Sequence, residues 1–164
     1  MLGGARSGKS SLAERLVRSM GGQPTYIATA TAGDEEMFAR IAQHREQRGE
    51  GWHTVEEPLA LADAIRAADG PVLVDCLTLW LSNLMFAERD VAVETTRLLD
   101  TLVTSPVVLV SNEVGMGLVP DTPLGRRFRD AQGRLNQAVA AAVPRVLFVA
   151  AGLPIVLKIP LELP

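Results

Sequence analysis

Short apolar runs alternate with longer stretches of helical periodicity along the 164 residues of the chain. The apolar runs are rich in Val, Ile and Leu without strict alternation, which is typical of strands buried on both faces of a parallel sheet. This pattern predicts strands at Thr25–Thr29, Val72–Asp75, Val107–Ser111, Arg145–Ala150 and Ile155–Ile159. Strands interleaved with helices predict an α/β fold, with a mainly parallel sheet flanked by helices, in a single domain of residues 1–164.

Six segments have the apolar spacing of amphipathic helices, and two of them begin with clear start signals. Asp34 is a candidate N-cap with acidic residues after it, and Thr122 is a candidate N-cap followed by Pro123 at the first helical position. The predicted helices are Lys9–Ser19, Asp34–Arg48, Leu59–Ala68, Leu77–Phe86, Val91–Val103 and Pro123–Ala142. At least one helix therefore follows each of the first three predicted strands, as parallel pairing requires.

Composition and charge exclude several classes of function. Hydrophobic residues make up 48% of the chain and charged residues 21%, as in a compact globule. A net charge of −3 and an aromatic content of 4% argue against nucleic-acid binding through phosphate neutralisation or base stacking. The longest mostly apolar stretch, Val146–Leu157, is too short to span a bilayer, and Cys76 is the only cysteine. We therefore expect a cytoplasmic protein without membrane insertion, secretory leader or disulfide bond.

The most specific motif lies at the start of the chain, where eight residues match the phosphate-loop pattern G-x-x-x-x-G-K-[ST] in full. They are Gly3, Gly4, Ala5, Arg6, Ser7, Gly8, Lys9 and Ser10. Lys9 would reach the β and γ phosphates of a nucleotide, and the Ser10 hydroxyl would bind Mg²⁺. The alternative is a chance match, but helix-forming residues follow at once. Only Met1 and Leu2 precede the motif, so either the first strand is very short or it has a few further residues upstream of Met1, which is the alternative we favour.

Polar side chains follow two of the predicted strands at the sheet end where open α/β folds bind ligands. Asp75 ends the apolar run that begins at Pro71, and there it could hold Mg²⁺ or contact a nucleotide. The alternative is that Asp75 caps the next helix. Asn112 and Glu113 follow the strand that ends at Ser111. Glu113 could act as a base toward a substrate hydroxyl, or equally as a helix cap or loop carboxylate.

His44 lies on a predicted helical face between arginines, with Arg40, Arg45 and Arg48 close to it in sequence. Cations around a histidine disfavour a metal and favour an anionic phosphate, and neutral imidazole is a competent nucleophile toward phosphorus. From the residues alone, however, a surface histidine on a charged helix is the favoured interpretation. His53 has no such surroundings, and we interpret it as structural.

Seven stretches together resemble one known family. They are Gly3–Ser10, Tyr26–Ala30, Glu36–Arg48, Asp75–Leu84, Ser111–Pro120, Arg127–Gln137 and Ala151–Lys158. In this order they are similar to the bifunctional adenosylcobinamide kinase/adenosylcobinamide-phosphate guanylyltransferases of cobalamin biosynthesis. The resemblance implies a recombinase-type P-loop NTPase fold, assembled as a homotrimer. It also implies phosphorylation of adenosylcobinamide with ATP or GTP, followed by GMP transfer from GTP to adenosylcobinamide phosphate, which gives adenosylcobinamide-GDP and pyrophosphate.

The resemblance also implies which residues do the chemistry. The family's guanylylated histidine falls on His44, and Lys9 is the second catalytic residue. Mg²⁺ would be held by Ser10 and Asp75. Besides the phosphate loop, the implied nucleotide contacts are Ala28, Thr29, Ala30, Arg45, Glu46, Gln47, Arg48, Glu56 and Asp75.

Two other functions are compatible with the phosphate loop. One is a small-metabolite P-loop kinase that forms no covalent intermediate, for which His44 would be incidental. The other is a GTP-dependent regulatory module. The sequence contains no N-K-x-D segment of the kind that recognises guanine in switch GTPases, which argues against the second.

Overall fold

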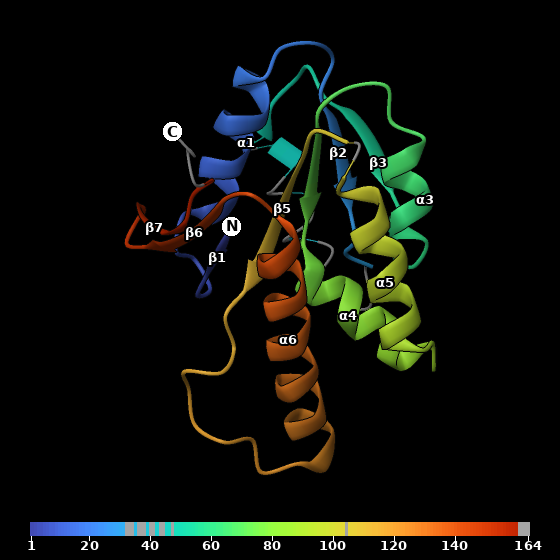
Figure 1. The fold of residues 1–164 in the computed structure, drawn as a ribbon, viewed down its shortest axis with the longest axis vertical. Helices are drawn as coiled ribbons and strands as arrows, with labels where there is room; N and C mark the ends of the chain where they lie inside the picture. Colours follow the sequence, from blue (N-terminus) through green and yellow to red (C-terminus); the bar gives the residue numbers. More distant parts are fainter. Residues whose placement is uncertain are drawn as a thin grey trace.

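The computed structural model describes residues 1–31, 35, 39, 42, 45–46, 48–103 and 105–160 (Figure 1). Its seven-stranded sheet has the order β3-β2-β4-β5-β1-β6-β7, and every neighbouring pair is parallel except β6 and β7. The strands are β1 (Leu2–Gly3), β2 (Thr25–Ala28), β3 (His53–Glu56), β4 (Val72–Asp75), β5 (Val107–Asn112), β6 (Val146–Ala150) and β7 (Leu153–Lys158). The predicted α/β class with a mainly parallel sheet is therefore confirmed.

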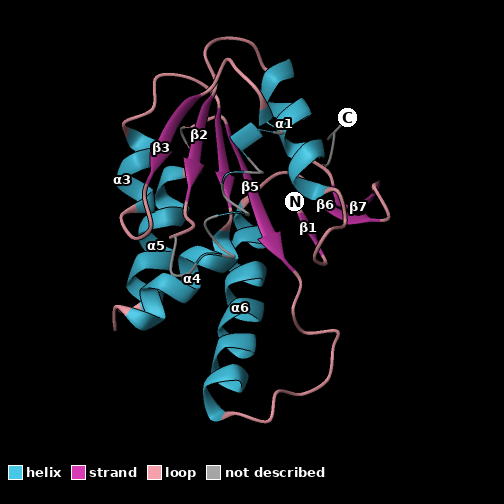
Figure 2. Ribbon diagram, turned by 180° about the vertical axis from the view of Figure 1, so that it is seen from behind, coloured by secondary structure: helices cyan, strands magenta, loops and turns pink. Residues whose placement is uncertain are grey.

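Helices cover both faces of the sheet (Figures 1 and 2). The described helices are α1 (Lys9–Ser19), α3 (Leu61–Arg66), α4 (Leu77–Phe86), α5 (Val91–Thr101) and α6 (Pro123–Ala142). On one face, α1 packs against β4 and β5 around a cluster that includes Ala13, Val17 and Leu73. The other four helices bury a larger core on the opposite face, centred on Trp80 and Leu81. Successive residues of each strand point to opposite faces, so each strand contributes to both cores.

Several predicted boundaries are confirmed to the residue, namely those of α1, α4, α6 and β4. The predicted helix Leu59–Ala68 instead begins at Leu61, because a Glu57 carboxylate oxygen accepts hydrogen bonds from the Leu59 and Ala60 N–H groups. The predicted helix Asp34–Arg48 lies mostly outside the described residues and stays a prediction.

Two strands differ from the prediction. The edge strand β3 is not predicted from the sequence. His53, for which we expected a structural role, is the first residue of this strand and is exposed. The strand predicted as buried at Ile155–Ile159 is β7, which begins at Leu153, runs antiparallel to β6 and leaves five of its six residues exposed. Its single neighbour explains the exposure, since β7 is the last strand of the sheet.

The shortest strand, β1, lies between β5 and β6 and pairs with both. The Met1 ammonium donates to the Leu109 carbonyl oxygen over 2.6 Å, and burial lowers its pKa to about 6, with a smaller contribution from Lys9. A cavity of about 360 Å³ opens beside Met1, lined by the first residues of β5 and β6. The phosphate-loop residues Gly3–Ser10 lie at the other end of β1 and do not line this cavity.

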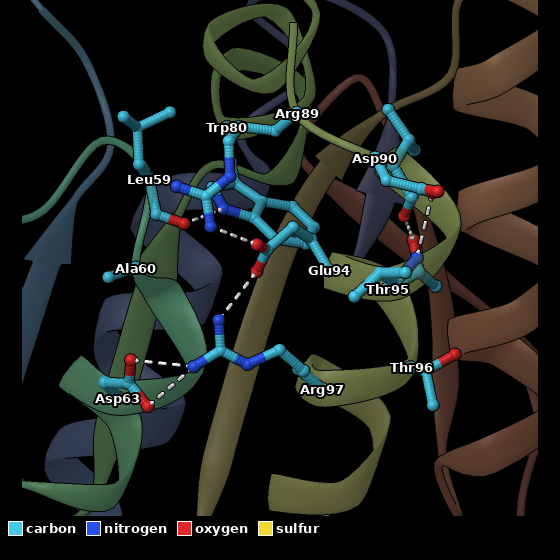
Figure 3. A network of polar contacts seen from close by, with 12 residues as sticks. Leu59, Ala60, Asp63, Trp80, Arg89, Asp90, Glu94, Thr95, Thr96 and Arg97 are labelled. Carbon is cyan, nitrogen blue, oxygen red and sulfur yellow. Dashed lines mark hydrogen bonds and ion pairs between the residues drawn. The ribbon is translucent and has the colours of Figure 1, made fainter. Parts of the chain in front are cut away.

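A buried carboxylate joins α3 to α5 on the larger core (Figure 3). Glu94 is only 6% exposed and accepts hydrogen bonds from Arg89 and Arg97, and Arg97 also bridges to Asp63 of α3. Beside this network the Trp80 indole N–H donates to the Leu59 carbonyl oxygen over 2.9 Å. Loss of one of the two arginines would leave the buried Glu94 carboxylate only partly paired, which lowers the stability of the fold.

We expect Glu94→Gln to lower the free energy of unfolding by about 1–2 kcal/mol, because both arginines are partly solvated and lose only part of their stabilisation. Urea denaturation measures the effect, and the exposed Glu88→Gln is the control. Equal stabilities for the two variants would show that the network contributes nothing.

Candidate active site

The phosphate loop connects β1 to α1, as the motif predicts. Arg6 and Gly8 have positive φ values of 54° and 91°, which turn the backbone sharply before the helix. Gly8 is the N-cap of α1, so the helix begins at Lys9. The free N–H groups and partial positive charge of a helix N-terminus favour an anion at this position.

The Lys9 side chain is folded across this loop. Its Nζ donates to the Gly4 carbonyl oxygen over 2.9 Å, and the residue is only 8% exposed. Burial lowers the pKa of Lys9, and the negative charge of Asp75 opposes that shift. A desolvated ammonium bound to a neutral carbonyl oxygen gains electrostatic stabilisation when a negatively charged phosphate replaces that carbonyl.

Asp75 lies at the carboxyl end of β4, on the face of the sheet that α1 covers. Its Oδ2 accepts a hydrogen bond from the Tyr26 hydroxyl over 3.1 Å. Burial and the Asp75 charge both raise the pKa of Tyr26, so this hydroxyl remains a donor. The N-cap of α4 is Cys76 and receives no side-chain cap. The helix-cap alternative for Asp75 is therefore wrong. The structure instead places the Asp75 carboxylate close enough to Lys9 for their charges to interact.

The predicted contacts at Ala28, Thr29 and Ala30 follow the end of β2, where Ala28 pairs with Asp75 in register. The Thr29 hydroxyl donates to the Cys76 carbonyl oxygen over 2.7 Å and accepts from the Cys76 N–H over 2.8 Å. Asn83 of α4 donates to the Thr29 carbonyl oxygen over 2.7 Å. The fully buried Thr29 side chain therefore ties the ends of β2 and β4 together and so positions Asp75.

Arg48 is buried against Tyr26, with its guanidinium carbon 3.7 Å from the centre of the Tyr26 ring. It donates to the Thr54 hydroxyl over 3.1 Å, and Arg18 of α1 donates to its carbonyl oxygen over 3.0 Å. The segment that ends at Arg48 is thus attached to the same tyrosine that contacts Asp75.

Two other implied nucleotide contacts, Arg45 and Glu56, form an ion pair with each other, and both are exposed. Glu46 is also exposed. His44 and Gln47 lie outside the described residues, so their predicted roles stay predictions.

The comparison with known families settles what kind of protein this is. The family model described as cobinamide kinase / cobinamide phosphate guanyltransferase matches residues 1–157. The chain belongs to this family. It is 52% identical over 165 residues to the bifunctional adenosylcobalamin biosynthesis protein CobP of Pseudomonas aeruginosa, covering 96% of this chain and 95% of that protein. The family resemblance inferred from the seven motif stretches is therefore confirmed.

Two enterobacterial relatives agree with this assignment. The bifunctional adenosylcobalamin biosynthesis protein CobU of Escherichia coli is 42% identical over 176 residues, which is 95% of this chain and 97% of that protein. The protein of the same name from Salmonella typhimurium is 40% identical over 178 residues, with the same coverage. The chain is thus a bifunctional cobinamide kinase and guanylyltransferase of cobalamin biosynthesis.

Glu113 of this cobinamide kinase/guanylyltransferase acts on its own loop. Its two carboxylate oxygens accept hydrogen bonds from the N–H groups of Gly115 and Met116, over 2.8 and 3.0 Å. The Glu113 N–H donates to the Gly3 carbonyl oxygen over 3.1 Å. The structure therefore favours the loop-carboxylate interpretation, at the start of the long loop between β5 and α6 (Figure 1).

Mg²⁺ fits the residues predicted to hold it. Ser10 and Asp75 supply a hydroxyl and a carboxylate near the phosphate loop, and Mg²⁺ is commonly bound by one or two such oxygens together with substrate phosphates. Within the described ranges no three His, Cys, Asp or Glu side chains gather into a metal cluster. No described helix has the length and apolar character needed to cross a membrane.

Two residues that shape the site were not predicted from the sequence. Tyr26 and Asn83 hold Asp75 and Thr29, and both lie inside stretches that carry the family resemblance. Their residue types alone gave no signal, because a tyrosine or an asparagine in a helix or strand has many ordinary roles.

Proposed function

We propose that the enzyme assembles the nucleotide loop of cobalamin in two reactions that share the phosphate loop. The first phosphorylates the aminopropanol hydroxyl of adenosylcobinamide with ATP or GTP. The second transfers GMP from GTP to adenosylcobinamide phosphate through a guanylylated His44. The observation that supports this most directly is the buried Lys9 ammonium, held against the Gly4 carbonyl beside Asp75.

In the kinase reaction the chain mainly binds and neutralises phosphates. The loop N–H groups and Lys9 would hold the β and γ phosphates, while Ser10 and Asp75 would hold Mg²⁺. A Mg²⁺ ion held by these residues would add positive charge that stabilises the phosphates during transfer. Phosphoryl transfer asks a protein for little beyond such positioning and charge stabilisation.

In the guanylyltransferase reaction the His44 imidazole attacks the α phosphorus of GTP. A nitrogen–phosphorus bond forms as the bond to pyrophosphate breaks. A phosphate oxygen of adenosylcobinamide phosphate then attacks the same phosphorus, which gives adenosylcobinamide-GDP and frees the imidazole. The cationic neighbours of His44 in sequence, Arg45 and Arg48, favour an anion at this position. This covalent relay, in which His44 carries the guanylyl group between the two substrates, divides one difficult displacement into two.

The covalent intermediate can be tested directly with GTP labelled at the α phosphate. We expect the label to stay on the protein in a denaturing gel, to be lost in acid but not in alkali, and to be released by adenosylcobinamide phosphate. GTP labelled at the γ phosphate is the control and should leave no such label. An alkali-labile bond, or a label mapped to a residue other than His44, would contradict the relay.

We further propose that the enzyme is a cytoplasmic homotrimer. Support for the compartment comes from Cys76, which is the only cysteine of the chain and forms no disulfide bond. Support for assembly comes from β7, whose aliphatic side chains are largely in solvent at an unpaired sheet edge. Leu153, Ile155 and Leu157 are 70%, 54% and 58% exposed. An exposed aliphatic strand at a sheet edge is a template for pairing with another chain.

We expect Ile155→Glu to convert the oligomer to a folded monomer, because the substitution places a charge in the contact. Light scattering at micromolar concentration measures the mass. Val103→Glu, at a position 86% exposed on another part of the surface, is the matched control and should leave the assembly intact. A parent protein that is already monomeric would overturn the trimer.

A further inference from the structure

The two-residue turn Ala151–Gly152 joins β6 to β7 and contacts the phosphate loop. Both turn residues have positive φ, 51° and 78°, as type I′ hairpin turns require. The Gly152 N–H donates to the Ser7 carbonyl oxygen over 2.8 Å. A turn near the end of the chain therefore holds the middle of a loop near its beginning.

This close contact is possible because glycines, which have no Cβ, occupy the positions where the two segments meet. A Cβ on Gly8 would lie 3.1 Å from the Gly152 Cα, and a Cβ on Gly3 would lie 2.4 Å from the Val149 carbonyl oxygen. Gly3 also pairs with Val149 between β1 and β6. One hairpin thus supports both ends of the phosphate loop, with β6 against Gly3 and the turn against Ser7 and Gly8.

The contact determines which way a peptide group faces. In a trans peptide the C=O and N–H groups point in opposite directions. The Ser7 carbonyl and the Gly8 N–H belong to one such peptide, so a Ser7 oxygen held by Gly152 turns the Gly8 N–H away from the hairpin. Gly8 is the N-cap of α1, and N–H groups at that place are the ones that bind phosphate.

We propose that Gly152 is a positioning residue for nucleotide binding: its N–H holds the Ser7–Gly8 peptide in the orientation that presents the Gly8 N–H to a phosphate. The inference rests on the proposed role of residues 3–10 as the phosphate site. It gives the turn Ala151–Gly152 a part in both reactions without contact between the turn and the nucleotide.

Two substitutions at Gly152 test the proposal. Valine is strongly disfavoured at positive φ, whereas asparagine tolerates it and keeps the N–H in place. Loss of one hydrogen bond to the loop should weaken ATP and GTP binding by about 5–10-fold in Gly152→Val. Gly152→Asn should bind close to the parent. In kinase assays the valine variant should show a raised KM for the nucleotide, with a smaller change in kcat.

Gly21 offers a matched control for general strain. Its φ is also 78°, an added Cβ there also has nothing within 4 Å, and its N–H also donates to a backbone carbonyl, that of Arg18. Gly21→Val should lower the thermal unfolding temperature as Gly152→Val does, yet leave nucleotide affinity unchanged. Equal loss of affinity in the two valine variants, or unchanged affinity in Gly152→Val, would overturn the positioning role.

A third variant keeps the test decisive if Gly152→Val does not fold. Glycolic acid incorporated at position 152 replaces only the N–H with an ester oxygen and adds no side chain. It should weaken nucleotide binding, and full affinity in this ester variant would overturn the proposal. If the parent enzyme itself did not bind ATP or GTP, the proposed function of the loop would be contradicted instead. Nucleotide binding by the parent therefore distinguishes failure of the proposed function from failure of the Gly152 proposal.

Discussion

Lys9→Ala should lose both activities, with kinase and guanylyltransferase rates each reduced ~10²–10³-fold or more. The ammonium is the one buried cation of the phosphate loop, and both reactions bind a nucleoside triphosphate there under the proposed mechanism. Formation of cobinamide phosphate and of cobinamide-GDP should be measured separately. The fold should survive, because among the described residues the Lys9 Nζ makes a single hydrogen bond, to Gly4.

The chain supplies its own control for this substitution, since Lys158 is the only other lysine. The Lys158 Nζ donates to the carbonyl oxygens of Ala140 and Ala141, each over 2.9 Å, at the end of α6. Lys158→Ala removes the same charge away from the loop, so it should lower stability and leave both activities. If Lys9→Ala retained either activity, the two reactions would not share one phosphate loop.

His44→Ala should separate the two activities. Guanylyl transfer should fall ~10³-fold or more, because the variant lacks the nucleophile that accepts GMP. Phosphorylation of adenosylcobinamide should continue near the parent rate, since γ-phosphoryl transfer needs no covalent relay and the loop is intact. The two products are again assayed separately, with the α-labelled protein band as a third measurement.

His53→Ala is the matched control, as His53 is the only other histidine and lies exposed on β3. It should keep both activities and the covalent label. An His44→Ala enzyme that still makes adenosylcobinamide-GDP near the parent rate would show that the guanylyl group does not pass through His44. Loss of the kinase activity as well would place His44 in the binding of the nucleotide rather than in the relay.

Helix boundaries were predictable where the signal is local. Thr122 accepts a hydrogen bond from the Gly125 N–H and Pro123 follows it. The residues at the start of α6 are therefore enough to predict where this helix begins. The strand β3 was missed for the opposite reason. Three of its four residues are polar, and they are extended because they pair with β2. The exposure of β7 likewise depends on the reversal at Ala151–Gly152, which makes it the antiparallel edge.

The sequence by itself determined the phosphate loop, the carboxylate Asp75 that ends β4 and the mainly parallel sheet. Each follows from neighbouring residues, whose spacing sets backbone conformation and side-chain periodicity. Only the tertiary structure decided that the Thr29 hydroxyl binds Cys76, that Arg48 packs on Tyr26 and that Gly152 holds Ser7. These contacts join residues far apart in the chain. A polar group has many possible partners in a sequence, and which one it meets is settled when the strands pair and the helices pack.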